Sequence, residues 1–254
     1  MRVILIIAYL LLLIDGSAEI ALAGDVGGHR FQFELETGPV WQGRNDVQIP
    51  NDEKGTRYSL VDLAGKGPYP SFRFYGTWNI NSKHGLRLLL APLSSTETGE
   101  FERPVDFAEG SFEPYVPTDV TYRFNSWRLT YRYQLYDKSK WSAWIGFTAK
   151  IRDAKIQLKQ VESTATETDL GFVPLLHLAF EYQLTSRSRL LLDLDALAGG
   201  PGRAEDLSVK LSYRLGERLA LSGGYRTLEG GADVDRVYNF AWLHYAVISL
   251  SYRL

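Results

Sequence analysis

Polar and apolar residues alternate along most of this chain, and the alternation is clearest between residues 126 and 158. Apolar residues occupy every second position up to Leu135, and after the polar break "DKSK" the same alternation resumes. A period of two puts successive side chains on opposite faces of an extended strand. The pattern therefore predicts two antiparallel strands joined by a tight turn. Their apolar face consists of Trp127, Leu129, Tyr131, Tyr133 and Leu135 on one strand and Ala143, Ile145, Phe147, Ala149 and Ile151 on the next.

Comparable segments recur from His29 to the end of the chain. They predict ten strands, at residues 29–41, 70–80, 85–95, 118–136, 141–158, 168–184, 188–198, 205–215, 218–228 and 237–253. Short polar connections such as "NSKHG" and "TSRS" alternate with longer ones, at 42–70, 96–117, 159–168, 199–205 and 229–236. Short turns on one side and longer loops on the other are typical of transmembrane β-barrels. The predicted fold class is therefore all-β, an antiparallel transmembrane β-barrel of ten strands with both termini on the short-turn side.

Two of the predicted strands are longer than a bilayer requires. Crossing a membrane takes about 9–11 tilted residues, and the segments 118–136 and 141–158 are nearly twice that long. Because the excess lies toward the longer loops, the barrel is expected to extend beyond the membrane on the extracellular side. The segment 42–70 leaves the strand count open, since "TRYSLVDL" within it has the composition of an additional strand.

The first 23 residues differ from the rest of the chain. One arginine precedes an apolar run from Val3 to Ile14, and a polar stretch then ends in Ala21-Leu22-Ala23. This is the layout of a cleaved signal peptide, and the run is too short for a membrane-spanning helix. The prediction is a signal peptide at 1–23 and a single barrel domain at 24–254. The chain contains no cysteine, which excludes a lipoprotein anchor, disulfides and thiolate metal sites.

The last strand carries a resemblance to a known class of protein. Ala246, Ile248, Leu250, Tyr252 and Leu254 alternate up to the final residue, which is similar to the C-terminal signal of bacterial outer-membrane proteins, although that signal ends in Phe or Trp. As architecture, the chain resembles a small bacterial outer-membrane β-barrel protein. The resemblance implies location in the bacterial outer membrane, contact with outer-membrane lipid and lipopolysaccharide, and recognition of the C-terminal strand by the barrel-assembly machinery.

If the apolar residues face lipid, the alternate residues face the lumen. Placing Arg or Lys on the lipid face at mid-membrane costs about 2–4 kcal/mol per residue, and because both signs are present the charges can pair inside. We expect either a lumen packed with ion pairs or a charged path for a small polar solute. The predicted lumen charge network comprises Glu34, Arg73, Arg87, Arg128, Arg132, Lys150, Arg152, Glu181, Asp193, Asp195, Lys210, Arg214 and Arg226; Arg30, Glu36 and His177 share this face.

Candidate catalytic residues are few, and the sequence predicts no catalytic site. His177 and Glu181 lie four apart on one predicted strand, too far apart along it for a direct acid–base pair. Strict alternation points His244 at lipid, where lipid A-modifying barrels such as a lipid A deacylase place catalytic residues, but "LHYAV" lacks the accompanying serine. The alternative is a bulge that turns His244 inward or a place for it in the aromatic girdle. Omptin-type proteases are also ten-stranded barrels, with catalytic Asp and His residues at the outer rim, and no histidine here falls in a predicted outer loop.

The outer loops carry many acidic residues, six of them in 97–117. Asp233 and Asp235 are the candidates for Ca²⁺ ligands, but the further oxygen ligands of a calcium loop do not follow them. No cofactor is expected, and the net charge of −2 gives no reason to expect nucleic acid as a partner. Three functions follow as hypotheses: an outer-membrane barrel with a structural, binding or minor porin-like role, an outer-membrane enzyme acting on lipid A or peptides, and a loop-based receptor or adhesin.

Overall fold

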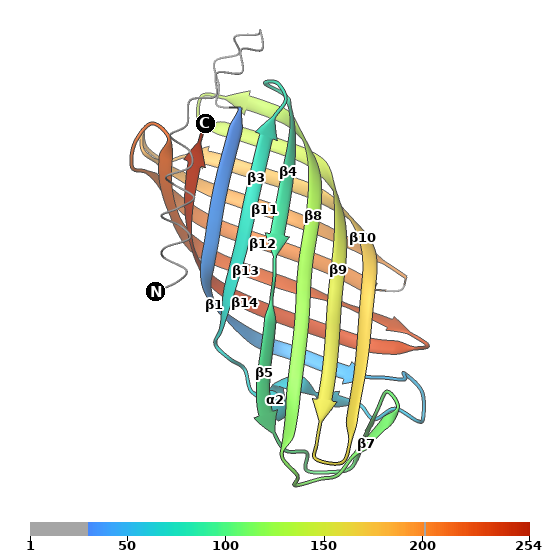
Figure 1. The fold of residues 1–254 in the computed structure, drawn as a ribbon. Coiled ribbons are helices and arrows are strands. Elements are labelled where there is room, and N and C mark those ends of the chain that lie inside the picture. The colour runs from blue at the N-terminus through green and yellow to red at the C-terminus, as the bar shows by residue number, and fades with distance from the viewer. Residues whose placement is uncertain (1–29, 201) are drawn as a thin grey trace.

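The structure, a computed structural model, describes residues 30–200 and 202–254, and the predicted signal peptide at 1–23 lies outside them. The described residues form one antiparallel sheet that closes on itself as a ten-stranded barrel, because the last strand pairs with the first (Figure 1). The barrel strands are β1 (Phe31–Gln48), β3 (Tyr69–Asn79), β4 (His84–Ala91) continued by β5 (Ser94–Gly99), β8 (Thr118–Lys138), β9 (Trp141–Lys159), β10 (Thr164–Gln183), β11 (Ser188–Gly199), β12 (Gly202–Arg214), β13 (Leu219–Val234) and β14 (Val237–Arg253).

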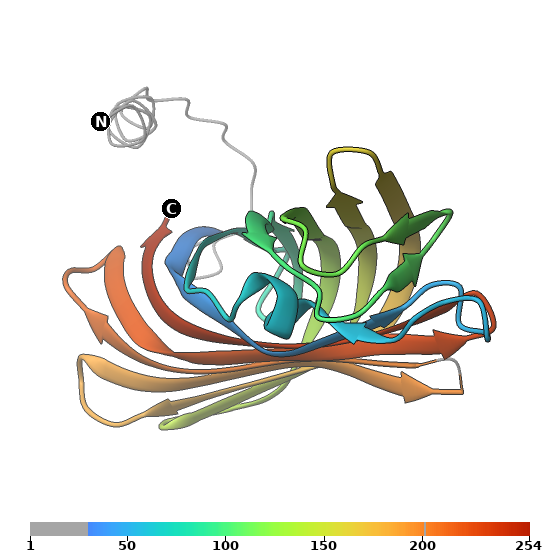
Figure 2. The same ribbon diagram turned by 90° about the horizontal axis from the view of Figure 1, so that it is seen from below.

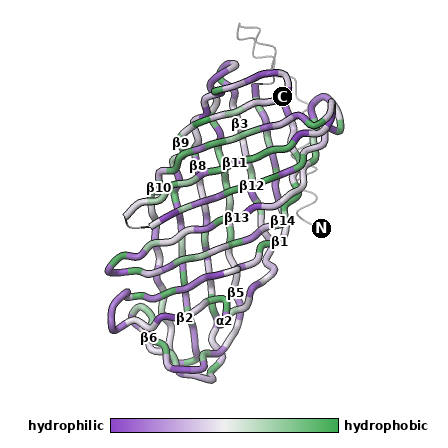
Figure 3. Tube along the Cα trace, turned by 180° about the vertical axis from the view of Figure 1, so that it is seen from behind, coloured by the Kyte–Doolittle hydropathy of each residue, from purple (hydrophilic) through white to green (hydrophobic). Residues whose placement is uncertain are grey.

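The alternation of the sequence becomes the two faces of the barrel wall. Hydrophilic and hydrophobic residues recur in turn along the strands (Figure 3), and every strand of the wall places large apolar side chains on the exterior. One from each strand illustrates this band: Phe33, Phe72, Leu88, Leu129, Phe147, Leu176, Leu192, Leu211, Leu221 and Ile248 are all exposed. No helix within the described residues is long and apolar enough to cross a bilayer.

Above this band the outward face becomes charged. Arg123 on β8 pairs with Asp153 on β9, with 2.7 Å between Nη2 and Oδ1, and Arg44 on β1 pairs with Asp46. Charges of this kind are costly next to lipid tails. The long strands therefore continue past the membrane on the loop side, as their length predicts.

The strand positions agree with the sequence prediction, but three of the predicted long loops are wrong. Residues 159–168 and 229–236 and the described part of 199–205 are largely strand. Tight turns connect β9 to β10 and β13 to β14, and Gly199 of β11 pairs with Gly202 of β12. These segments extend the strands above the membrane, because the backbone hydrogen bonds between neighbouring strands form whether the side chains are polar or apolar. Among the connections that the structure describes, only those from β1 to β3 and from β5 to β8 are long.

A bulge in β1 changes which residues face the lumen. The pairing with β14 shifts between Gln42 and Arg44, so that Gly43 is the extra residue. Below the bulge Val40 and Gln42 are buried inside, and above it Asn45 and Val47 are. A Cβ on Gly43 would lie 2.6 Å from Nε2 of His244, so a larger residue at this position would require the histidine ring to shift.

The two long connections fold into a cap over the outer end of the barrel (Figure 2). The segment 42–70 adds no barrel strand: it continues β1 and then forms β2 (Tyr58–Ser59) and the short helix α2 (Leu60–Ala64). The second connection forms the hairpin of β6 (Val105–Phe107) and β7 (Gly110–Phe112). We call these two connections, residues 49–68 and 100–117, the outer cap.

The outer cap has a hydrophobic core of its own. Its apolar side chains pack against inward-facing residues of β1, β8, β9 and β10, and Phe107 is fully buried. Tyr58 is enclosed in this core, where burial raises the pKa of its hydroxyl. The cluster contains Val47, Ile49, Tyr58, Leu60, Leu63, Phe101, Val105, Phe107, Phe112, Val120, Tyr122, Ile156, Leu158 and Ala165.

Candidate functional site

Charged side chains from seven strands converge in the middle of the lumen. Asp206 on β12 is the common acceptor: Arg73 donates from Nη2 at 2.9 Å and Arg128 from Nη2 at 2.6 Å to its Oδ2, and Nη1 of Arg226 donates to its Oδ1. Three guanidinium groups thus meet one carboxylate whose side chain is 2% exposed. Charge-assisted bonds of this kind hold buried ions that would otherwise be unfavourable.

Glu36 on β1 is the second acceptor of this cluster. It accepts hydrogen bonds from Arg226 Nε at 3.0 Å and from Lys210 Nζ at 2.9 Å, and Arg73 Nε lies 3.5 Å away. Lys210 also donates to Glu34. The result is a continuous network in which the arginines bridge the two carboxylates, so that the opposite walls of the barrel are joined across the lumen.

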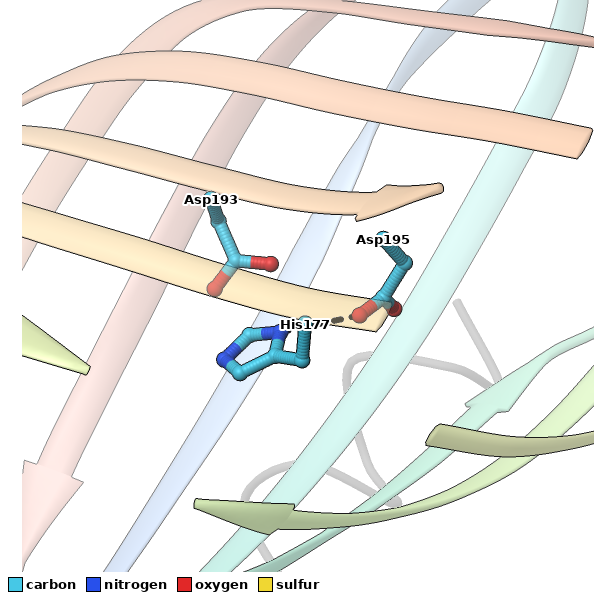
Figure 4. A group of neighbouring side chains, drawn as sticks. All are labelled: His177, Asp193 and Asp195. Carbon is cyan, nitrogen blue, oxygen red and sulfur yellow. Dashed lines mark hydrogen bonds and ion pairs between the residues drawn. The ribbon is translucent and has the colours of Figure 1, made fainter. Parts of the chain in front are cut away.

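A third group lies on β10 and β11 and is shown in Figure 4. Asp195 accepts from Arg128 Nη1 at 2.8 Å and from His177 Nδ1 at 2.8 Å, and Asp193 accepts a bidentate pair from Arg87 at 2.5 and 3.0 Å. Because a carboxylate only accepts, the proton of this histidine lies on Nδ1. Its Nε2 is buried and has no hydrogen-bond partner among the described residues.

His177, Asp193 and Asp195 have the residue types of a metal site, and their ligand atoms lie within 4.8 Å of one another. Each carboxylate is nevertheless already held by an arginine, and Asp195 also accepts from Thr148 Oγ1 at 2.9 Å. A metal ion would have to displace Arg87 and Arg128 and so break the charge-assisted hydrogen bonds that hold these carboxylates. The donor set therefore fits an ion-pair network better than a metal centre.

The structure brings most of the predicted lumen residues into one network, but three of them make their contacts outside it. Arg152 faces inward above the network and pairs with Asp169, a half-exposed carboxylate on β10. Glu181 pairs with Arg189 at 3.2 Å near the turns. Arg214 is exposed beside the turn between β10 and β11, where it donates to the carbonyl oxygen of Ser186.

Two predicted cations lie inside without a carboxylate partner among the described residues. Lys150 is buried directly across the β8–β9 ladder from Arg128, and its Nζ lies 4.9 Å from the centre of the Phe124 ring. Arg132 packs on the indole of Trp144, with 5.0 Å between the guanidinium carbon and the ring centre. The interior therefore holds more positive charge than its ion pairs use.

The central acceptor, Asp206, is absent from the predicted network. The sequence could have identified it, because alternation along β12 places Asp206 on the same inward face as Ser208 and Lys210. Tyr75 is a second omission: its hydroxyl accepts hydrogen bonds from Arg73 Nε at 3.0 Å and Arg226 Nη2 at 2.8 Å. Both residues complete the network between the arginines.

The other candidate residues lie outside the lumen. His244 faces the exterior with its ring tilted against that of Trp242, and its Nδ1 is 2.5 Å from the hydroxyl of Tyr225. This is a position in an aromatic cluster at the upper edge of the apolar band. Asp233 and Asp235 are exposed near the β13–β14 turn, where Asp233 accepts from Asn51 Nδ2 at 2.8 Å.

The lumen is closed at more than one level. Arg73, Arg128, Arg226, Glu36 and Asp206 are each at most 4% exposed, so solvent scarcely reaches the network from either end. Above it lies an apolar layer, and the outer cap follows. Below it, toward the turns, a cavity of about 90 Å³ remains. The apolar layer consists of Val40, Tyr69, Leu228, Leu243, Tyr245 and Val247.

The closed antiparallel barrel, its exterior apolar band and its ion-paired interior define the class of protein. A membrane-spanning barrel must satisfy its backbone within itself and present apolar side chains to lipid, and this chain meets both requirements. It is a bacterial outer-membrane β-barrel protein, located in the outer membrane.

Comparison with solved structures finds similar chains at low sequence identity. The outer-membrane protease OmpT of Escherichia coli is similar with a TM-score of 0.54 and 8% identity over 91% of this chain and 99% of that chain. Ail, the attachment invasion locus protein of Yersinia pestis, is similar with a TM-score of 0.39 and 10% identity over 89% of this chain and 99% of that chain. No family model matches the sequence, and no curated protein matches it. The similarity to OmpT is one of fold alone.

Proposed function

We propose that the protein is a closed outer-membrane barrel with a structural or binding role, and that solutes do not pass through it. The observation that carries the proposal is the buried network around Asp206, which fills the middle of the lumen with mutually paired side chains. Opening a path would require separating several buried ion pairs at once. Breaking one such pair is strongly unfavourable.

The outer cap supports the binding part of the proposal. Its loops pack on a hydrophobic core instead of extending into solvent, so they present a defined surface. That surface and its rim are acidic, since ten exposed carboxylates accompany four exposed cations. The carboxylates are Asp52, Glu53, Asp62, Glu97, Glu100, Glu102, Asp106, Glu109, Glu113 and Asp119, and the cations are Lys54, Arg57, Lys66 and Arg103. Charge of one sign favours partners of the other, so a basic ligand is the partner that this surface fits.

Two further partners belong to the same proposal. The exterior apolar band, with charged side chains directly above it, suits contact with outer-membrane lipid and lipopolysaccharide. The last strand, β14, is the segment by which the barrel-assembly machinery would recognise the chain.

Conductance across a planar lipid bilayer tests the closed lumen. Folded wild-type protein is expected to give no discrete, reproducible current steps, and a variant lacking residues 100–117 is expected to behave in the same way because the network below the cap is intact. Heat-modifiable migration on gels controls for folding. Stable conductance of the folded wild-type protein would overturn the proposal.

A further inference from the structure

The cavity at the turn side of the network lies between the barrel wall and the charged core. Its lining includes Gln32 and Thr77, which lie close to the turn-side ends of β1 and β3, and Glu181 near the end of β10. Glu181 and Asp193 remain partly exposed, so solvent enters from this side. A cavity of about 90 Å³ is larger than the roughly 10–15 Å³ that a single water needs.

Four cations line this cavity, and three of them are already paired. Arg87 is held by Asp193, Lys210 by Glu34 and Glu36, and Arg226 by Glu36 and Asp206. The fourth is Arg132. It makes no ion pair with any described residue, and its Nε is buried without a hydrogen-bond partner.

The neighbours of Arg132 leave its donors uncovered. In the ladder it lies opposite Gly85 on β4 and opposite Gly146 on β9, so no side chain flanks it directly on either side. A Cβ on Gly146 would lie 2.0 Å from the carbonyl oxygen of Tyr131, which makes glycine obligatory there. Trp144 packs against the guanidinium. Stacking on an aromatic ring fixes the plane of a guanidinium and leaves the N–H groups on its edge free to donate.

The charge around the turn-side end would bring anions to this cavity. Nine cationic side chains lie there with three acidic ones in the described residues. The cations are Arg30, Lys83, Lys138, Lys140, Arg187, Arg189, Arg214, Arg218 and Arg253, and the acids are Asp137, Glu181 and Glu217. A positive entrance raises the local concentration of anions.

We infer that this cavity is a binding site for a compact oxyanion, a phosphate or carboxylate group, held by the fork of Arg132 on the periplasmic side of the closed lumen. Two parallel N–H donors of a guanidinium match two oxygens of such a group. The anion pairs with the lining cation that makes no ion pair with any described residue. The site is separate from the outer cap and does not depend on the partner of that surface.

Calorimetric titration of the folded protein in detergent tests the site. Inorganic phosphate, acetate and glycerol 3-phosphate are titrated at constant ionic strength, with chloride as the reference anion. At least one oxyanion is expected to bind with measurable heat where chloride does not. Tighter binding of glycerol 3-phosphate than of inorganic phosphate would identify a lipid headgroup as the source, and the reverse would identify a free anion.

The matched variants are Arg132→Gln and Arg218→Gln, which remove the same charge from the same end of the barrel. Arg132→Gln should weaken oxyanion binding at least tenfold, whereas Arg218→Gln, in an exposed turn, should leave it nearly unchanged. Arg132→Lys keeps the charge without the fork and should bind at an intermediate level. Heat-modifiable migration confirms that each variant is folded. Equal binding by wild type and Arg132→Gln, or binding no stronger than that of chloride, would overturn the inference.

Discussion

Asp206→Asn removes the charge on which three arginines depend and nearly preserves the shape of the side chain. In the wild type, Arg73, Arg128 and Arg226 all donate to this carboxylate, and its side chain is 2% exposed. Removing one partner of a buried ion pair costs about 3–5 kcal/mol because the other charge remains buried. Glu36 and Asp195 still accept from two of these arginines. We therefore expect a loss of about 3–5 kcal/mol in the free energy of unfolding, and not three times that amount.

Denaturant unfolding in lipid vesicles, followed by tryptophan fluorescence, measures this loss. Asp169→Asn is the matched control, because Asp169 also pairs with an arginine but its side chain is 52% exposed. An exposed pair contributes about 0–1 kcal/mol, so this variant should unfold nearly as the wild type does. If the two substitutions destabilise the barrel equally, or if Asp206→Asn costs less than about 1 kcal/mol, the network is not a stabilising closure of the lumen and the reasoning fails.

Three other substitutions test separate parts of the structure. Lys150→Met should raise the free energy of unfolding by roughly 1–4 kcal/mol, as replacing buried ionic groups by apolar ones can, and a destabilised variant in the same assay would show that Lys150 has a compensating partner. Phe107→Ala should destabilise the outer cap by about 3–5 kcal/mol, seen as faster proteolysis of residues 100–117 while the barrel stays heat-modifiable; unchanged cleavage would mean that the cap core is not cooperative. We assign His244 a packing role beside Trp242 that Phe would keep, so His244→Phe should leave the mass of lipid A unchanged on overexpression. A modification of lipid A made by the wild type and lost in the variant would instead support the enzyme hypothesis.

The fold was predictable because a barrel wall repeats one local rule. Period-two alternation identifies each strand without knowledge of its neighbours, and the strand positions follow from it. The lengths of the outer loops were not predictable in this way. In 229–236 and in the described part of 199–205, polar and small residues occupy both faces of the strand, so the contrast between the faces fades although the strands stay paired.

The sequence predicts which residues face the lumen, but it does not predict which of them pair with one another. Alternation points Arg73 and Glu36 inward, but it does not say which residue across the barrel each one meets. Arg73 and Asp206 are 133 positions apart, and Arg226 and Glu36 are 190 apart. Their contact depends on the stagger of all ten strands, to which one sequence gives no access. The outer cap was missed for a related reason, since its core is built from irregular loops whose apolar residues have no period.

Thiol labelling from each side of the membrane tests the closed lumen most directly. The chain contains no cysteine, so a single introduced thiol reports one position. Thr77→Cys places it in the cavity below the network, and Glu53→Cys places it on the exposed outer cap. A membrane-impermeant maleimide added outside intact cells should label Glu53→Cys and not Thr77→Cys, and the latter should react only once the periplasm is opened. Labelling of Thr77→Cys from outside, in folded protein, would contradict a barrel closed by its buried charges.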